Sequence, residues 1–422
     1  ESMSQVRRLA SLTVAVLFAV LTCSVASAQQ IKTVFVIAME NHNWTQPNNQ
    51  FTGGIQQIFQ NPAAPFINSL VNGTATAVIN GRQVNISQQV AFATNYRNVL
   101  ATAGGNNPHI HPSEPNYIWA EAGTNFGVFN DNDPFAPASG TGQISNQDNQ
   151  LHLTRLFDQC GVSWRSYQED TDLVPDGTSF DNVVLPRNQW TVPLKSLSGN
   201  FVSGVNQFNG STQFNYAAKH NPQVFFSDAS GGKDATTANP RRLQYAPLQQ
   251  LFVDLANNDV AQFNWISPDQ FNDQHTTLAA GFKGLTGDPA KILQGDSFLQ
   301  QIIPVIMASK AYQDHGAIIL WWDESESDGV SGDNPDDLTH TVPEIVISPL
   351  AHPNEGGSPF ASDVFLTHSS DLRTMQEIFH VTNPFLLGDA IHANDLSSLF
   401  ADGAIPTSGR GGDRGNGSCG RD

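Results

Sequence analysis

Cysteine and basic residues are scarce in this chain, and their scarcity excludes several classes of protein. Only three cysteines occur among 422 residues, so the chain has neither a disulfide framework nor a cysteine metal site. Lys and Arg together number 20 against 39 Asp and Glu, which gives a formal net charge of -19. Because such a chain has no broad basic face, we do not expect it to be a general binder of nucleic acid or of anionic membranes.

Long apolar runs are also scarce, and the most prominent one lies near the N-terminus. Arg7 and Arg8 precede an apolar run over 9–20, and the tripeptide Ala-Ser-Ala ends at residue 28. A charged start, an apolar centre and a small-x-small end are typical of a secretory signal peptide, so we predict cleavage after about Ala28. No second apolar stretch reaches membrane-spanning length. We therefore expect a secreted or periplasmic protein without stable membrane insertion.

Strand and helix patterns alternate along the rest of the chain. Continuous apolar, β-branched runs predict buried strands over 31–40, 223–228, 261–267, 316–324 and 343–350. Apolar residues at three- and four-residue spacing predict helices over 151–161, 245–258, 297–313 and 370–380. The alternation predicts a doubly wound α/β fold, in which helices cover both faces of a mostly parallel central sheet.

The predicted elements form one large domain with loop insertions. Three stretches without strong periodicity are predicted to be long loops, over 124–150, 170–212 and 325–339. The Gly/Arg-rich end is predicted to be disordered. The chain is therefore divided into a signal peptide over 1–28, a folded domain over 29–402 and a tail over 403–422.

A serine in the stretch HPSEPNY, residues 111–117, lies at a predicted helix start. Proline is favoured in the first helical turn, where its missing N–H costs nothing, so Ser113 is expected at or just before the first turn. Free backbone N–H groups at such a position attract anions. The alternative is an ordinary serine that caps the helix.

Carboxylates and histidines follow several predicted strands. In doubly wound folds ligands bind beyond the carboxyl ends of the strands, so we expect these side chains to gather at one edge of the sheet. Each one taken alone is explained by a strand that meets solvent. Oxygen and imidazole ligands without cysteine suit Zn, Mn, Mg, Ca or Fe, and the sequence does not distinguish among them. The set comprises Glu40, Asp269, Asp273, His275, Asp323, Glu324 and His340.

Short motifs in a fixed order resemble the phosphoesterase family of the alkaline-phosphatase-like superfamily. They are MEN at 39–41, HPSEPNY at 111–117, PDQFNDQH at 268–275, DE at 323–324, HTVPEIVISP at 340–349 and HSSDLRT at 368–374. GVSWRSYQE at 161–169 and KHNPQVFF at 219–226 extend the resemblance, which runs from about Lys32 to Leu387. The chain is similar above all to secreted bacterial and fungal acid phosphatases, and then to bacterial phospholipases C.

The resemblance implies a serine nucleophile beside one or two divalent metal ions. Ser113 occupies the position of the nucleophile, and the residues of a first metal site would be Glu40, Asp323 and Glu324. A second metal site would comprise Asp269, His275 and His340. The chain departs from the family in two places: relatives commonly have Asp-His where this chain has Asp323-Glu324, and the gap from 269 to 275 is longer than usual. Asp273 is therefore an alternative ligand.

Other family positions are expected to contact the substrate. Asn41 lies at the first metal or the phosphate, and either it or Asn116 would donate hydrogen bonds to phosphate oxygens. His111 would position the site or protonate the leaving group, or else bind its own loop. Further positions that could reach the phosphate or the site are His220, Asn221 and His368, although the first two could equally form a turn that ends at Pro222.

The implied activity is that of a secreted, metal-dependent phosphoric-monoester hydrolase, with 29–402 as the phosphoesterase catalytic domain. Its substrate would be a small phosphorylated molecule or a phospholipid head group. One alternative is a phosphodiesterase of the phospholipase C type, a branch that draws its nucleophile from the helix before GVSW, where this chain has His152 and Thr154. A second alternative is a catalytically silent, metal-stabilised binding protein of the cell surface.

Overall fold

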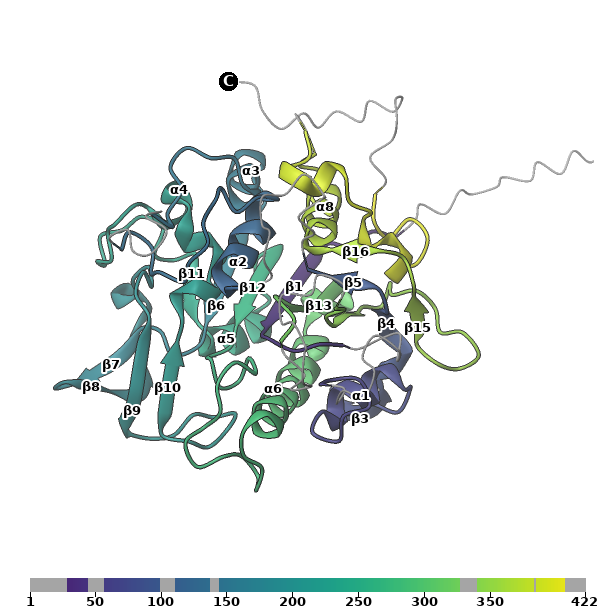
Figure 1. Cartoon of the computed structure of the whole chain (residues 1–422), viewed down its shortest axis with the longest axis horizontal. Coiled ribbons are helices and arrows are strands. Elements are labelled where there is room, and N and C mark those ends of the chain that lie inside the picture. Colours follow the sequence, from purple (N-terminus) through teal and green to yellow (C-terminus); the bar gives the residue numbers. More distant parts are fainter. Residues whose placement is uncertain are drawn as a thin grey trace, which may run out of the picture.

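An eight-stranded sheet lies at the centre of the computed structural model, which describes residues 29–44, 57–98, 111–136, 144–326, 340–382 and 385–406. The strand order is β11-β6-β12-β1-β13-β14-β4-β15 (Figure 1). In chain order the strands are β1 (Thr33–Met39), β4 (Val90–Ala93), β6 (Trp164–Gln168), β11 (Tyr245–Pro247), β12 (Phe263–Ser267), β13 (Gly316–Trp322), β14 (Glu344–Ile347) and β15 (Phe360–Ser362). The predicted signal peptide and most of the predicted tail lie outside the described residues.

The sheet is mostly parallel, as the sequence predicts. Val36 in β1 pairs with Trp265 in β12 and with Ile319 in β13, in parallel register on both sides. Only β14 runs antiparallel to its neighbours β13 and β4 within this sheet. Strands β1, β12 and β13 are almost entirely buried, because their apolar side chains are covered on both faces. The buried parallel strands fix the edge at which the polar residues meet.

Helices cover both faces of the sheet (Figure 1). On one side lie α2 (Ser113–Ala122), α3 (Leu153–Cys160) and α8 (His368–Ile378). On the other side lie α1 (Pro65–Val71), α5 (Gln249–Asn257) and α6 (Asp288–Ala308). The short helices α4 (Ser227–Ser230) and α7 (Lys310–Gln313) complete the set. Each of the four predicted helices overlaps a helix here, and no helix in the described ranges has both the length and the hydrophobicity needed to cross a bilayer.

A second sheet lies in the stretch expected to be a loop over 170–212. It has the order β10-β9-β8-β7 and comprises β7 (Leu173–Asp176), β8 (Ser179–Val184), β9 (Leu197–Ser203) and β10 (Gln213–Tyr216). Most of its side chains are exposed or half-buried, and its small core consists of Leu173, Phe201 and Phe214. The loop prediction was wrong because the apolar residues within 170–212 form neither a continuous run nor a regular alternation with polar ones, so these short strands lack a clear strand pattern. Small pairs are formed by β2 (Thr76–Ile79) with β3 (Arg82–Asn85) and by β5 (Tyr96–Arg97) with β16 (Leu366–Thr367).

The strand predicted over 223–228 is also absent. A 3-10 turn over Pro222–Phe225 leads into α4 there. Val224, Phe225 and Phe226 are nonetheless fully buried. A short apolar run has the same pattern in a buried turn as in a buried strand, which explains the wrong prediction.

Candidate active site

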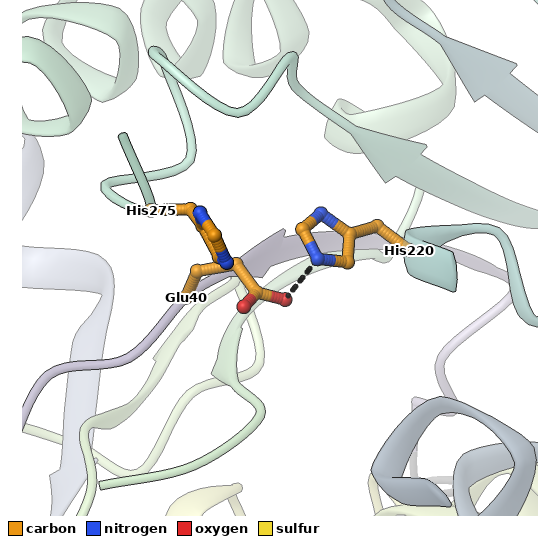
Figure 2. Close-up of side chains that lie close together, drawn as sticks. All are labelled: Glu40, His220 and His275. Atoms are coloured by element: carbon orange, nitrogen blue, oxygen red, sulfur yellow. Dashed lines mark ion pairs between the residues drawn. The ribbon is translucent and has the colours of Figure 1, made fainter. Parts of the chain in front are cut away.

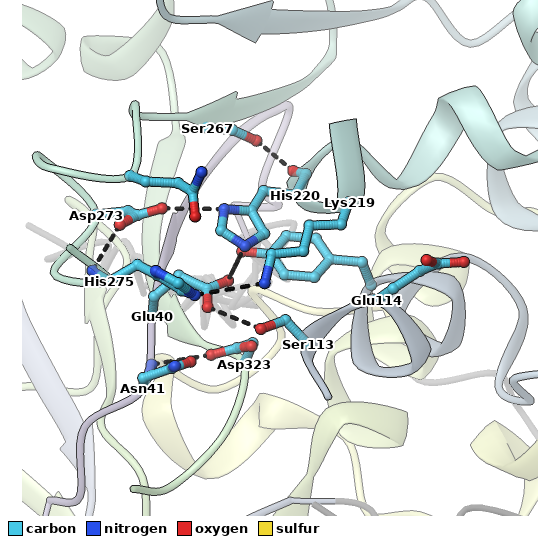
Figure 3. A network of polar contacts seen from close by, with 12 residues as sticks. Glu40, Asn41, Ser113, Glu114, Lys219, His220, Ser267, Asp273, His275 and Asp323 are labelled. Carbon is cyan, nitrogen blue, oxygen red and sulfur yellow. Dashed lines mark hydrogen bonds and ion pairs between the residues drawn. The ribbon is translucent and has the colours of Figure 1, made fainter. Parts of the chain in front are cut away.

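Ser113 is the first residue of α2, as its sequence context predicts. Its side chain is buried and points toward the ends of β1 and β13 (Figure 3). The Ser113 hydroxyl oxygen lies 3.1 Å from Glu40 Oε2 and 3.2 Å from Glu324 Oε1, so it donates to one of these carboxylates. A helix start and two strand ends, far apart in the sequence, thus meet at one hydroxyl group.

Three buried carboxylates form the acidic part of the site. Glu40, Asp323 and Glu324 each offer an oxygen within 4.8 Å of the other two. Burial, and after it the charge of Asp323, holds the pKa values of Glu40 and Glu324 well above their usual range, and burial raises the pKa of Asp323 to about 6. No N–H or O–H group in the described part of the chain donates to Asp323 Oδ2, although that oxygen is buried. Three carboxylates in such a place need a proton or a cation between them.

A second group of ligand atoms shares Glu40 with the first. One atom each of Glu40, His220 and His275 lies within 4.8 Å of the other two (Figure 2). Burial lowers the pKa of His220 well below its usual range and that of His275 to about 3, so both rings are neutral near pH 7. His220 Nδ1 lies 3.0 Å from Asp273 Oδ2, and its Nε2 lies 3.2 Å from Glu40 Oε1. A neutral ring that donates from Nδ1 turns a lone pair toward Glu40, and two facing acceptors suit a bound cation.

Two residues that the sequence reasoning missed contact this site. The Tyr117 hydroxyl donates to Glu40 Oε1 at 2.5 Å, and its ring stacks on His220. Tyr117 follows Ser113 by four residues, and that spacing on a helix was a usable signal. Lys219 Nζ lies 2.9 Å from Asp131 Oδ2 and 3.4 Å from His275 Nε2. Lys219 is the first residue of the segment KHNPQVFF, and that position was a usable signal.

Lys219 places a positive charge among the acidic groups. Burial acts to lower the pKa of Lys219, but the carboxylates of Asp131 and then Glu40 raise it overall. The ammonium group therefore remains protonated, which offsets part of the negative charge of the site.

Asn116, His111 and Asn41 surround the acidic oxygens. Asn116 Nδ2 donates to Glu324 Oε2 at 2.9 Å, and His111 Nδ1 lies 2.7 Å from Glu324 Oε1. The backbone N–H of Asn41 donates to Asp323 Oδ1 at 3.1 Å. With its amide nitrogen turned inward, Asn41 also donates to Glu40 Oε2 at 2.8 Å and to Glu324 Oε1 at 3.2 Å. The expected neighbours of Ser113 are therefore assembled.

Other predicted site residues lie away from the Ser113 hydroxyl. Asn221 turns into the fold, where its amide contacts the Ser166 hydroxyl at 3.0 Å and the Tyr216 hydroxyl at 3.3 Å. His368 Nε2 lies 2.5 Å from the backbone oxygen of Asp323, so it contacts the backbone just after β13 and not the Ser113 hydroxyl.

The proposed second-site ligands also separate in space. Asp269 belongs to a different group, with Glu169 and Asp170, and not to the group that contains Glu40. His340 is buried beside Thr341, and it belongs to none of the candidate metal groups found in the described ranges. The structure therefore brings His275 to Glu40 but does not bring Asp269 there. Asp273 contacts all three members of the group: its carboxylate lies 3.0 Å from His220 Nδ1 and accepts from the His275 N–H at 2.8 Å, and its backbone oxygen accepts from the Glu40 N–H.

The alternative nucleophile region forms its own buried network. The Thr154 hydroxyl donates to Glu121 Oε2 at 2.9 Å at the start of α3. His152 lies between Glu121, at 3.1 Å, and Asp228, at 2.9 Å. Neither residue belongs to a candidate metal group in the part of the chain that is described.

Comparisons with known proteins find acid phosphatases among the relatives of this chain in sequence. An acid phosphatase of Aspergillus fumigatus is 30% identical over 196 residues, which are 46% of this chain and 34% of that protein. A probable acid phosphatase of Kluyveromyces lactis is 25% identical over 225 residues, 52% of this chain and 39% of that protein. The matched segments thus span well under half of the curated relatives. A Vibrio parahaemolyticus protein in the alkaline phosphatase superfamily is 13% identical, with a TM-score of 0.44 over 89% of this chain and 72% of that chain.

The family itself follows from a broader match. The Phosphoesterase family model covers residues 19–382, which includes every motif described above. The resemblance predicted from the sequence is confirmed: this chain belongs to the Phosphoesterase family.

Proposed function

We propose that this protein is a metal-dependent hydrolase of phosphoric monoesters, similar to acid phosphatases, with Ser113 as its nucleophile. The observation that carries the proposal is the position of the Ser113 hydroxyl, at the start of α2 and within hydrogen-bonding distance of Glu40 and Glu324. Membership of the Phosphoesterase family supports the class of reaction. The acid phosphatases among the relatives support a monoester as the substrate.

The residues present fit one or two divalent metal ions. Glu40, Asp323 and Glu324 would hold a first ion, and the orphaned Asp323 Oδ2 would be one of its ligands. Glu40, His220 and His275 would hold a second ion. A bound metal ion supplies a lowered hydroxyl pKa and stabilises the charge on the phosphoryl oxygens.

Ser113 performs the bond exchange in this mechanism. Its oxygen forms a bond to phosphorus while the bond from phosphorus to the alcohol oxygen breaks. The hydroxyl proton moves to Glu40 or Glu324, both of which it already contacts, and the departing alcohol oxygen takes up a proton. Water then cleaves the phosphoserine to release phosphate and restore the hydroxyl.

Neighbouring residues orient the substrate and the base. The backbone N–H of Ser113, which carries a partial positive charge, and the Lys219 ammonium would bind the phosphoryl oxygens. The next two positions of α2 offer no free N–H, because that of Glu114 donates to Asp131 Oδ1 and Pro115 has none. Asn41 would add a third donor. Asn116 holds Glu324 in place, and His111, whose side chain is 29% exposed, is placed to protonate the leaving oxygen.

We also propose secretion after cleavage near residue 28, and a catalytic domain over 29–402.

The proposal is tested with two chromogenic substrates. We expect the purified protein to hydrolyse p-nitrophenyl phosphate, and both EDTA and Ser113→Ala to abolish that activity, with a loss of about 10³-fold or more for the variant. Thr154→Val is the matched control, because it removes a hydroxyl at another helix start and should leave activity in place. Loss of activity in Thr154→Val with a fully active Ser113→Ala would overturn the assignment of the nucleophile.

The second substrate separates the alternatives. Hydrolysis of p-nitrophenyl phosphorylcholine alone would indicate a phosphodiesterase of the phospholipase C type. Metal binding without hydrolysis of either compound would indicate a silent binding protein, and the proposed function would then be wrong.

A further inference from the structure

A second cluster of carboxyl groups lies apart from Ser113, at the ends of β6 and β12. It comprises Glu169, Asp170 and Asp269, here called the second carboxyl cluster. The two strands are parallel neighbours whose last residues, Gln168 and Ser267, pair with each other, so the chain segments that follow them meet. One oxygen of each member lies within 4.8 Å of the others, and none of the three side chains is more than 1% exposed.

Asp269 carries a buried oxygen that receives no hydrogen. Its Oδ1 accepts from the backbone N–H groups of Phe271, at 3.0 Å, and Asn272, at 2.8 Å. No N–H or O–H group in the described ranges donates to its Oδ2. The Asp170 carboxyl lies within hydrogen-bonding reach of Asp269, so the two groups need either a shared proton or a cation between them. A buried oxygen in this position needs a positive partner.

Glu169 accepts hydrogen bonds at both of its carboxyl oxygens. Glu169 Oε1 accepts from Asn206 Nδ2 at 2.7 Å and from Asn272 Nδ2 at 2.9 Å, and its Oε2 accepts from the Asp269 N–H at 2.8 Å. Hydrogen bonds to a carboxylate favour its charged form. Burial, and after it the charge of Asp170, outweigh these hydrogen bonds and raise the pKa of Glu169 to about 8, so the three carboxyl groups need a proton or a cation among them.

We propose that Glu169, Asp170 and Asp269 bind a calcium ion at a site separate from the catalytic one. All three candidate ligands are carboxylate oxygens, without imidazole or thiolate, and an oxygen-only set is the chemistry of hard cations. Calcium accepts six to eight oxygens in flexible geometry, so the carboxylates can be completed by amide oxygens and water. The site rests on these contacts alone and does not depend on the proposed phosphatase activity.

The calcium site would stabilise the loop that carries active-site residues. Asp269 begins the segment over 269–275, which ends in His275. Within it, the backbone oxygen of Asp273 accepts from the Glu40 N–H at 2.8 Å, and its carboxylate contacts His220. The Asp170 carboxylate also accepts from the backbone N–H of Asn215 in β10, at 3.0 Å. An ion at Asp170 and Asp269 therefore ties this segment to the second sheet, which flanks β6 and β11 in Figure 1.

Calcium binding to the metal-depleted full chain tests the proposal. Titration with calcium chloride gives the number of ions per chain, and the melting temperature is recorded with and without calcium. We expect Asp170→Asn to bind one calcium ion fewer than the parent protein and to lose the calcium-dependent rise in melting temperature. The matched control is Glu324→Gln, which alters the catalytic carboxylates: it can lose an ion bound there, but it should keep the calcium-dependent rise in melting temperature.

Two outcomes would overturn the proposal. Equal stoichiometry and an equal rise in the parent and in Asp170→Asn would show that the cluster holds a proton instead of an ion. Loss of the rise in Glu324→Gln with its retention in Asp170→Asn would place the calcium at the catalytic site. Because Asp170→Asn could fail to fold, Glu169→Gln is measured alongside it, with circular dichroism to confirm the fold. Absence of phosphatase activity would refute the proposed function but would leave these stoichiometries unaffected.

Discussion

The two acidic groups of this protein lie at the same edge of one sheet, yet their surroundings differ. Around Ser113 the carboxylates meet a hydroxyl group, two neutral imidazoles and the ammonium of Lys219. Around Asp269 they meet other carboxylates, side-chain amides and backbone N–H groups, all buried. The strand ends supply acidic oxygens in both places, and the start of α2 adds the hydroxyl group of Ser113, the nucleophile that we propose, at only one of them. Position at a strand end therefore does not by itself make a catalytic site.

Among the tests of this comparison, the largest expected loss of activity comes from replacing one glutamate in each of the two acidic groups. Glu40→Gln should lower kcat/KM on p-nitrophenyl phosphate by about 100-fold or more, because residues that merely support a metal ligand already cost 10- to 100-fold. Glu169→Gln should retain most activity and lose thermal stability in calcium. Steady-state kinetics and melting curves of both variants measure this difference. Equal losses of activity in the two variants would contradict the separation of the two acidic groups.

A second prediction concerns the cation that only the Ser113 site contains. Lys219→Met should lower kcat/KM by about 100-fold, since a positioned donor to a phosphoryl group typically contributes that much. Lys195→Met, at an exposed lysine, is the control and should change nothing. Unchanged kinetics in Lys219→Met would show that this ammonium group forms an ion pair with Asp131 but does not bind the substrate.

A smaller loss of activity is expected from replacing His368, which contacts the backbone of Asp323. His368 Nε2 contacts the Asp323 backbone oxygen, and its other nitrogen lies 2.8 Å from the Tyr96 hydroxyl. His368→Ala should lower kcat by about 10-fold with little change in KM, because it displaces a strand end without touching the substrate. His368→Gln can restore the hydrogen bond to the carbonyl and should recover part of kcat. Equal kcat values for both variants would contradict a positioning role.

The smallest expected effect is on stability and concerns Asp296, a buried carboxyl group that belongs to neither acidic group. It accepts from the backbone N–H groups of Phe66 and Ile67, and burial raises its pKa to about 7. Its folded pKa lies above its unfolded value near 4, so its contribution to stability is complete below pH 4 and is lost as the pH rises through 7. Asp296→Asn should therefore flatten the pH dependence of the unfolding free energy by up to about 1.4 kcal/mol per pH unit. Urea unfolding in EDTA at pH 5, 6 and 7 measures the slope, and unchanged slopes would refute the prediction.

Local patterns allowed much of the central architecture to be predicted. The apolar runs of β1, β12 and β13 and the prolines beside Ser113 act within a few residues, so the sequence displays them directly. The grouping of Asp269 was beyond such reasoning. Its Oδ1 accepts from the N–H groups of Phe271 and Asn272, and this turn leaves the carboxyl group beside Glu169 and Asp170 instead of Glu40.

Long-range contacts decided the other differences. Asn221 follows His220 directly, yet the two side chains have different partners. The 3-10 turn over Ala218–His220 ends between these positions, so the next side chain points in another direction. His368 was expected to approach the substrate, and it is instead committed to a backbone carbonyl that lies 45 residues earlier in the chain. Such choices depend on which elements pack together, and no spacing within one segment contains that information.

The first turn of α2 has a consequence for how the site assembles. Ser113 contacts Glu40 and Glu324, Asn116 contacts Glu324, and Tyr117 contacts Glu40, all from one short piece of helix. A helix moves as a rigid body, so a displacement that breaks one of these contacts breaks the others with it. Inactivation by heat or denaturant should then be all-or-none at the level of the single molecule: each copy is either fully competent or silent, and residual activity counts the competent copies.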